Sequence, residues 1–144
     1  KWMPNKCSKW RSAANRLDSK YCVMRKEMTL IKVRESDIDG MGVFANQHIS
    51  KGEIIESCFY VVIDDDDLKK NSRLNDYVFQ SMDEDGDYYC VLGAGMIYNH
   101  GSDPNAEWQI SETDNRFLEF VALRDIAAEE EIVHDYGEDY WNTR

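Results

Sequence analysis

The chain has 144 residues, of which 42% are hydrophobic, so it is long enough for one domain with a packed core and short for two. No apolar run approaches the roughly 20 residues of a membrane helix, and the first residues lack the apolar core of a signal peptide. These features exclude a transmembrane protein and predict a soluble intracellular protein, cytoplasmic or nuclear.

The net charge of −11 is distributed unevenly along the chain. Residues 1–28 contain eight Lys or Arg and two acids, which gives +6, whereas residues 29–144 contain nine against twenty-six, which gives −17. We therefore predict a basic N-terminal arm and an acidic domain that attracts basic peptides or polyamines and repels nucleic acid. The arm itself could dock on the domain, contact a polyanion such as nucleic acid, or remain solvated.

The four cysteines and three histidines are scattered, without the close pairs that a structural zinc site uses. We predict free thiols and no metal site. A disulfide between Cys7 and Cys22 is the alternative, although a reducing compartment disfavours it.

The arm carries a helical pattern. Apolar residues recur at steps of four and three on one face: Trp10, Ala14, Leu17, Tyr21 and Met24. This spacing predicts an amphipathic helix over residues 8–25, packed on the domain or on a partner.

The acidic domain reads as mainly β, with many short strands, frequent turns and little helix. The expected strands occupy residues 28–34, 53–63 (as one strand or two), 88–98, 107–110 and 117–123. Turns are expected at residues 35–42, 51–52, 83–87 and 113–115. Four acids at residues 64–67 could begin a short helix or form a solvated loop.

Three short motifs stand out, each weak alone. Gly40-Met41-Gly42-Val43-Phe44 would let backbone approach a ligand, since glycine lacks a side chain. A central stretch follows, Tyr98-Asn99-His100-Gly101-Ser102-Asp103-Pro104-Asn105, and the third is Glu130-Glu131-Ile132-Val133-His134-Asp135-Tyr136-Gly137.

In this order and spacing the motifs resemble the SET-domain protein lysine methyltransferases, over roughly residues 30–141. The likeness is to the minimal, virus-type SET proteins. It implies a SET fold of small antiparallel sheets, with short helices and a C-terminal segment threaded under a loop near the central motif. It also implies S-adenosylmethionine as methyl donor and, as acceptor, lysine in a basic protein segment such as a histone tail.

The resemblance also implies roles for single residues. The cofactor would be held by the backbone of Gly40, Met41, Gly42 and Val43, by Asn99 and His100, and by Trp141 over the adenine, with Tyr77 beside the cofactor or substrate. Tyr136 would lie at the methyl-transfer site and Tyr140 would line the lysine channel. His134 stands where the family often has an aromatic or aliphatic residue, so it could alter the number of methyl groups added, assist proton removal, or be structural.

The chain departs from the family pattern at three places. Gly101 follows Asn99-His100 where serine is usual, and Glu129 replaces a glycine. No cysteine follows Tyr136, so Tyr140 and Trp141 would close the channel without a zinc-bound lid, with help from a partner subunit if the protein is a homodimer.

The sequence is also compatible with two other functions. A SET module without activity could bind basic peptides, and a methyltransferase could act on a polyamine or a non-histone protein.

Overall fold

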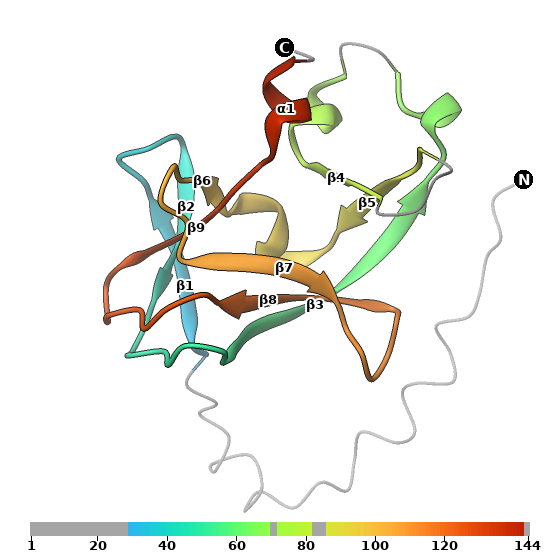
Figure 1. The fold of residues 1–144 in the computed structure, drawn as a ribbon. Helices are drawn as coiled ribbons and strands as arrows, with labels where there is room; N and C mark the ends of the chain where they lie inside the picture. The colour runs from blue at the N-terminus through green and yellow to red at the C-terminus, as the bar shows by residue number, and fades with distance from the viewer. Residues whose placement is uncertain (1–28, 70–71, 82–85, 143–144) are drawn as a thin grey trace, which may run out of the picture.

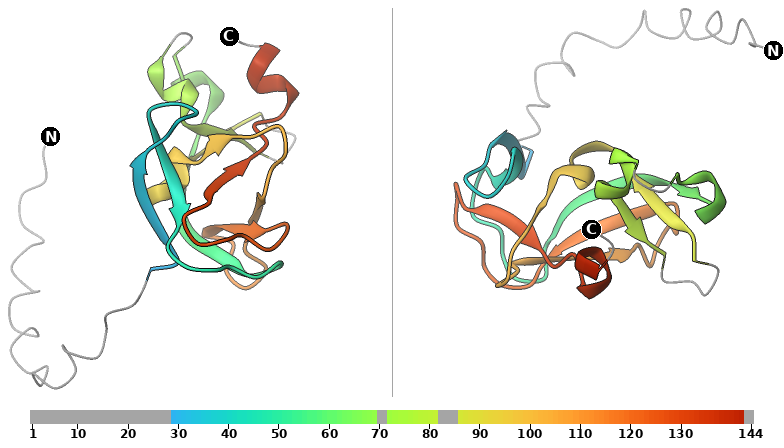
Figure 2. Two further views of the ribbon diagram at one scale, coloured as in Figure 1. Left: turned by 90° about the vertical axis from the view of Figure 1, so that its left-hand side faces the viewer. Right: turned by 90° about the horizontal axis from the view of Figure 1, so that it is seen from above.

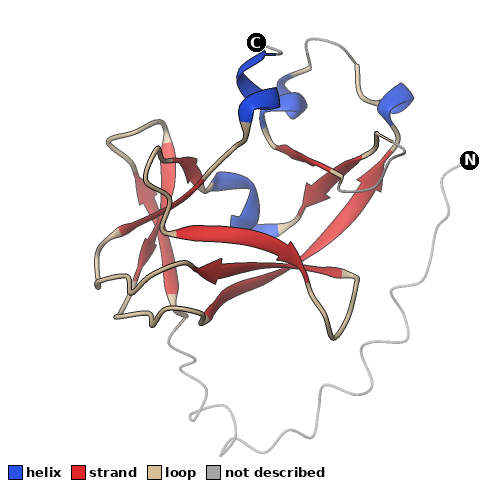
Figure 3. Ribbon diagram, in the orientation of Figure 1, coloured by secondary structure: helices blue, strands red, loops and turns tan. Residues whose placement is uncertain are grey.

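The computed structural model describes residues 29–69, 72–81 and 86–142 (Figure 1), and this part of the chain is mainly β. The predicted helix at residues 8–25 and the cysteines Cys7 and Cys22 lie outside the described residues. Figure 3 shows how little helix accompanies the strands. The strands are β1 (Ile31–Glu35), β2 (Met41–Ala45), β3 (Ile54–Ile63), β4 (Val78–Gln80), β5 (Tyr88–Val91), β6 (Asn99–His100), β7 (Ala106–Ile110), β8 (Phe117–Ala122) and β9 (Glu131–His134). The helical elements are the 3₁₀ turns η1 (Asp65–Asp67), η2 (Arg73–Asp76) and η3 (Gly93–Ile97) and the short α-helix α1 (Glu138–Asn142).

The strands form two sheets. A four-stranded sheet has the order β1-β2-β9-β6, and a five-stranded sheet has the order β4-β5-β3-β8-β7. All pairs are antiparallel except β6 with β9. The mainly β prediction is therefore confirmed, because β-branched and aromatic residues fill the pleated, half-buried strand positions.

The C-terminal strand β9 lies between β2 and β6, which come from distant parts of the sequence (Figure 2). On the β6 side Asn99 pairs with Val133 and His100 with His134. Beyond β6 the chain turns, and the amide of Asn105 donates to the carbonyl of Val133 over 3.2 Å. The central stretch thus runs along β9 and brings the second and third motifs into contact.

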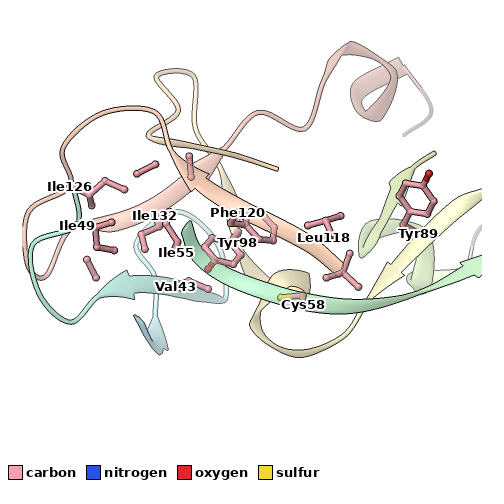
Figure 4. Packing of buried hydrophobic residues seen from close by; sticks show 14 residues of the cluster. Val43, Ile49, Ile55, Cys58, Tyr89, Tyr98, Leu118, Phe120, Ile126 and Ile132 are labelled. Carbon is pink, nitrogen blue, oxygen red and sulfur yellow. The ribbon is translucent and has the colours of Figure 1, made fainter. Parts of the chain in front are cut away.

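One hydrophobic core joins the two sheets (Figure 4). Ile49, Ile126 and Ile132 lie toward one end of it and Tyr89 toward the other, with the stacked rings of Tyr98 and Phe120 between them. The centroids of these two rings are 4.1 Å apart. The core therefore holds the backbone of Tyr98, which immediately precedes the central motif.

Two expectations about local structure were wrong. Residues 88–98 are not one strand, because β5 ends at Val91 and the 3₁₀ turn η3 begins at Gly93, whose φ is +96°. A Cβ at Gly95 would lie 2.5 Å from Val91 Cγ1, so the glycine lets this turn pack against the sheet. Gly42 lies inside β2 instead of ending a turn, paired with Arg34.

The acidic run after β3 forms the short 3₁₀ turn η1, with three exposed acids. The helices that the structure describes reach only five residues, too few to cross a bilayer. In these same ranges His, Cys, Asp and Glu side chains form no group of three that could hold a metal ion.

Candidate active site

Tyr136 is held at both its backbone and its hydroxyl. It follows β9 by two residues, and its hydroxyl donates to the carbonyl oxygen of Tyr98 over 2.8 Å. Its amide donates to Nδ1 of His100 over 3.3 Å. Because the Tyr136 hydroxyl proton is used in the bond to Tyr98, this oxygen can take part in a further hydrogen bond only as the acceptor.

Aromatic rings from β6 and α1 gather beside Tyr136. The centroid of its ring lies 4.6 Å from Tyr140 and 6.5 Å from Trp141, and Trp141 lies 5.1 Å from His100. The positive φ of Gly137, +79°, turns the chain from β9 into α1 so that these rings can meet. Trp141 is 55% exposed and offers an open aromatic surface.

A small cavity of about 50 Å³ lies against Tyr136. Its walls are mostly aromatic and come from four parts of the chain, and the carboxylate residues Asp76 and Asp135 also line it. The lining residues are Asp76, Tyr77, Val78, Phe79, Gly95, Met96, Tyr98, Trp108, His134, Asp135 and Tyr136. Aromatic faces and carboxylates together favour a cationic or alkylated ammonium group.

His134 is a neutral, buried wall of this cavity. Only 3% of it is exposed, and its ring stacks on Phe79 at a centroid distance of 5.5 Å. Burial lowers the pKa of His134 to about 4, with the nearby imidazole of His100 acting in the same direction and the Asp135 carbonyl opposing it. A group with this pKa is a weak base, so His134 is poorly suited to remove a proton from an ammonium group.

The glycine motif is tied to the central motif through Asn99. The side-chain amide of Asn99 donates to the carbonyls of Asp39 and Met41, over 3.1 and 3.3 Å, and to Oε1 of Glu131 over 2.9 Å. Asn99 is 9% exposed, so this buried amide fixes the turn before β2 against β9. The resemblance predicted that the Asn99 side chain would bind the cofactor. In this structure its amide hydrogens are directed to protein oxygens.

Gly42 is required by the same arrangement. A Cβ there would lie 2.3 Å from Glu131 Oε1 and 3.0 Å from the Ser36 Cβ. Ser36 also donates to that carboxylate over 2.7 Å. Glu131 therefore fills the space that a side chain at position 42 would need.

The structure brings most of the predicted residues into two adjoining groups. The residues of β2 and Asn99 meet through hydrogen bonds, and His100, Tyr136, Tyr140 and Trp141 meet through their rings. Gly40 precedes β2 with a φ of +45°, and the buried Val43 pairs with Ile132 of β9. Tyr77 belongs to neither group, but it lines the cavity together with His134 and Tyr136.

Several residues of the site were not predicted. Glu131 and Tyr98 belong to the motifs, and their contacts with Asn99 and Tyr136 depend on the pairing of distant strands. Asn105 is 1% exposed and strapped to β9, donating to the Glu131 carbonyl over 2.8 Å and accepting from the Val133 amide over 2.9 Å. In the sequence, only its position at the end of the central stretch pointed to Asn105 as part of the site.

Known proteins match this chain in sequence and in fold. The SET-domain family model matches residues 40–137. A histone-lysine N-methyltransferase of Schizosaccharomyces pombe, specific for H3 lysine-37, is 26% identical over 114 residues, covering 77% of this chain and 76% of that protein. The human histone-lysine N-methyltransferase EHMT1 is 30% identical over 149 aligned positions, which cover 96% of this chain and only 11% of EHMT1.

A solved structure of a candidate histone methyltransferase from Plasmodium falciparum has the same fold. It is 32% identical, with a TM-score of 0.63, and the match covers 78% of this chain and 97% of that one. The matched residues 40–137 contain all three motifs and the cavity-lining residues described above. The chain belongs to the SET-domain family.

Proposed function

We propose that this chain transfers a methyl group from S-adenosylmethionine to the side-chain amine of lysine in a basic protein segment such as a histone tail. The observation that carries the proposal is the position of Tyr136. Its hydroxyl is fixed on Tyr98, and its side chain lines the cavity of aromatic and acidic residues. Beside its ring lie His100, which follows Asn99 in β6, and Trp141.

The residues present fit S-adenosylmethionine, which supplies a methyl group on a sulfonium. Trp141 and Met41 are 55% and 46% exposed, so they offer apolar surface for an adenine ring next to the ordered backbone of β2. Gly42 leaves room for the Glu131 carboxylate, which accepts from the Asn99 amide beside that backbone. In this arrangement the Asn99 amide acts by fixing the backbone near residues 39–41.

The cavity is suited to the amine. Asp76 and Asp135 attract a lysine ammonium, and the rings of Phe79 and Trp108 exclude water around it. The amine must lose a proton before it can attack, at a cost of about 4–5 kcal/mol at neutral pH, and a neighbouring positive charge lowers that cost. The Tyr136 oxygen would orient the amine as a hydrogen-bond acceptor, because its own proton is donated to Tyr98.

His134 and Tyr140 complete the proposed site. A neutral imidazole in the cavity wall would influence how many methyl groups fit around the amine, while Tyr140 would narrow the channel next to Tyr136. Residues 29–144 would form the catalytic domain and residues 1–28 a separate arm. The virus-type subclass, a homodimer that completes the channel, and a cytoplasmic or nuclear location stay predictions.

The test measures transfer of labelled methyl from S-adenosylmethionine to histones, basic peptides and polyamines. Tyr136→Phe should lower the transfer rate about 100-fold, as expected when one oriented polar group is lost, without weakening cofactor binding. Tyr60→Phe is the matched control, because the Tyr60 hydroxyl also donates to a backbone carbonyl, that of Asn115 over 2.6 Å. Cofactor binding without transfer to any substrate would favour the peptide-binding module, and absence of cofactor binding would overturn the proposal.

A further inference from the structure

The five-stranded sheet carries apolar side chains on both faces. Alternation along β3 directs Cys58, 3% exposed, into the core and Phe59 to the opposite side. Phe59 and Val61 are 48% and 54% exposed on that side, and Leu92, beyond β5, is 48% exposed. The Phe59 ring lies 4.5 Å from that of Phe117 on β8.

We call the surface formed by Phe59, Val61, Leu92 and Phe117 the outer apolar face. Register places Cys90 opposite Val61 and Val78 opposite Cys90, so half-buried side chains extend the face across β5 and β4. No element within residues 29–69, 72–81 and 86–142 covers Phe59, Val61 or Leu92, given their exposure. An antiparallel sheet normally presents polar residues to water, and a gathered apolar surface marks a contact site.

We propose that residues 8–25 form a helix that packs across the outer apolar face. The helical stripe of this segment is apolar: Trp10, Ala14, Leu17, Tyr21 and Met24. A helix of 18 residues is about 27 Å long, and five strands at about 4.8 Å spacing span about 19 Å between the outer two. One such helix is therefore long enough to cross the sheet.

The charges near the outer apolar face also favour residues 8–25 as the segment that covers it. Residues 1–28 carry +6, and the exposed acids Asp64, Asp65, Asp66 and Asp67 directly follow β3, the strand that bears Phe59 and Val61. β3 is the central strand of the sheet, and Glu107 is exposed on the edge strand β7. Basic side chains beside the stripe would thus meet carboxylates at the end of the central strand β3 and on the edge strand β7.

The covalent link favours this segment over a second molecule. The carbonyl of Thr29 accepts from the side-chain amide of Asn46 over 2.8 Å, so the chain is anchored where the domain begins, four residues beyond residue 25. A tethered helix competes at an effective concentration of about millimolar, whereas a second copy must bind from solution. The inference concerns assembly of the chain and does not depend on the proposed catalytic function.

The first test is a mutant cycle on the full-length chain followed by thermal unfolding. Leu17→Ser in the stripe and Phe59→Ser on the face should each lower Tm by about 4 °C. The double variant should lose little more than one of them, because the two side chains act through one contact. Additive shifts, or no shift for Leu17→Ser, would overturn the proposal.

Matched controls separate the contact from simple loss of apolar surface. Val23→Ser changes an apolar residue that a helix would place off the stripe, and Val33→Ser changes a residue that is 43% exposed on β1, in the other sheet. Both should leave Tm within about 1 °C. Shifts as large as that of Leu17→Ser in either control would count against the docking.

The second test uses native thiols. In a Cys7→Ser background, a short bis-maleimide should link Cys22 to Cys90 within one chain, since Cys90 lies on the outer face and Cys58 is buried. Peptide mass spectrometry should find this link in the monomer fraction, and Leu17→Ser should reduce it severalfold. Links only between chains, with a dimer mass by light scattering, would assign the face to a second copy, and absence of the Cys22–Cys90 link would overturn the proposal.

Discussion

The hydroxyl of Tyr136 donates to the carbonyl oxygen of Tyr98 across 38 residues of sequence, at 2.8 Å. The Tyr98 ring in turn stacks on Phe120, and its own hydroxyl lies 3.2 Å from Oε2 of Glu56. Burial and the neighbouring Glu56 carboxylate raise the pKa of Tyr98. The position of Tyr136 therefore depends on core packing behind it.

Tyr98→Phe should separate the backbone anchor from the side-chain hydroxyl. The variant keeps the carbonyl and the stacked ring, so methyl transfer should stay within about twofold, while stability falls by about 1.5–3 kcal/mol with the lost hydrogen bond to the Glu56 carboxylate. Tyr98→Ala should cost about 3–5 kcal/mol and also slow transfer, because the core that supports the carbonyl is lost. A Tyr98→Phe variant as slow as Tyr136→Phe, measured in the same assay, would contradict the backbone anchor.

Gly42→Ala should weaken S-adenosylmethionine binding. The added Cβ would displace the Glu131 carboxylate, which accepts hydrogen bonds from Ser36 and Asn99. We expect calorimetry to show an affinity lower by about tenfold or more, because a loss of about 1.4 kcal/mol of binding free energy gives that factor. Gly52→Ala is the control: its φ of +81° makes the substitution costly to stability, but its Cβ meets no atom within 4 Å, so affinity should not change.

Glu129→Gly should stabilise the protein. Glu129 has a φ of +70° and is the one non-glycine residue with positive φ in the described part of the chain. Glycine would remove a backbone cost of about 1 kcal/mol, which exceeds the value of the exposed ion pair with Lys32. Glu129→Ala loses the same ion pair and keeps the strained backbone, so denaturant unfolding should rank Gly above both Glu and Ala; equal stability of the Gly and Ala variants would contradict this explanation.

Acid should destabilise the protein through His134. Its pKa is near 4 in the folded chain and 6.5 as a free group, so the unfolded state binds the proton more readily. Stability is unaffected by this group above about pH 6.5 and falls as pH drops toward 4, by up to about 3 kcal/mol. Urea unfolding between pH 7 and 5 should show this slope, and His134→Phe, which cannot titrate, should flatten it; an unchanged slope would contradict the assignment.

Asn105→Ala should loosen β9. The variant removes the bonds to the Glu131 carbonyl and the Val133 amide and leaves the buried amide of Val133 without that acceptor. We expect a loss of about 2–4 kcal/mol in the free energy of unfolding by denaturant titration. Asn46→Ala removes a side-chain amide that bonds the carbonyls of Thr29 and Ile31 at an exposed position, so its cost should be smaller.

The sequence by itself determined the β-rich class and the three motifs of the site. Short runs of β-branched and aromatic residues between turn residues predict strands, because these patterns are local. The motif around Tyr136 and the pair Asn99-His100 were identified through their resemblance to the SET-domain family. The strand limits in residues 88–98 failed because Gly93 has a φ of +96° and Gly95 lies too close to Val91 for a side chain, so these two glycines allow the turn η3 after β5.

Only the tertiary structure decided how these pieces meet. The parallel pairing of Asn99 with Val133, the cavity formed with Asp76 and Trp108, and the bond from Tyr136 to Tyr98 all join residues far apart in sequence. The outer apolar face was equally hidden, because β3 is apolar at both odd and even positions and alternation alone could not say which side faces the core. Long-range packing makes that choice, and it also leaves Phe59 and Val61 exposed.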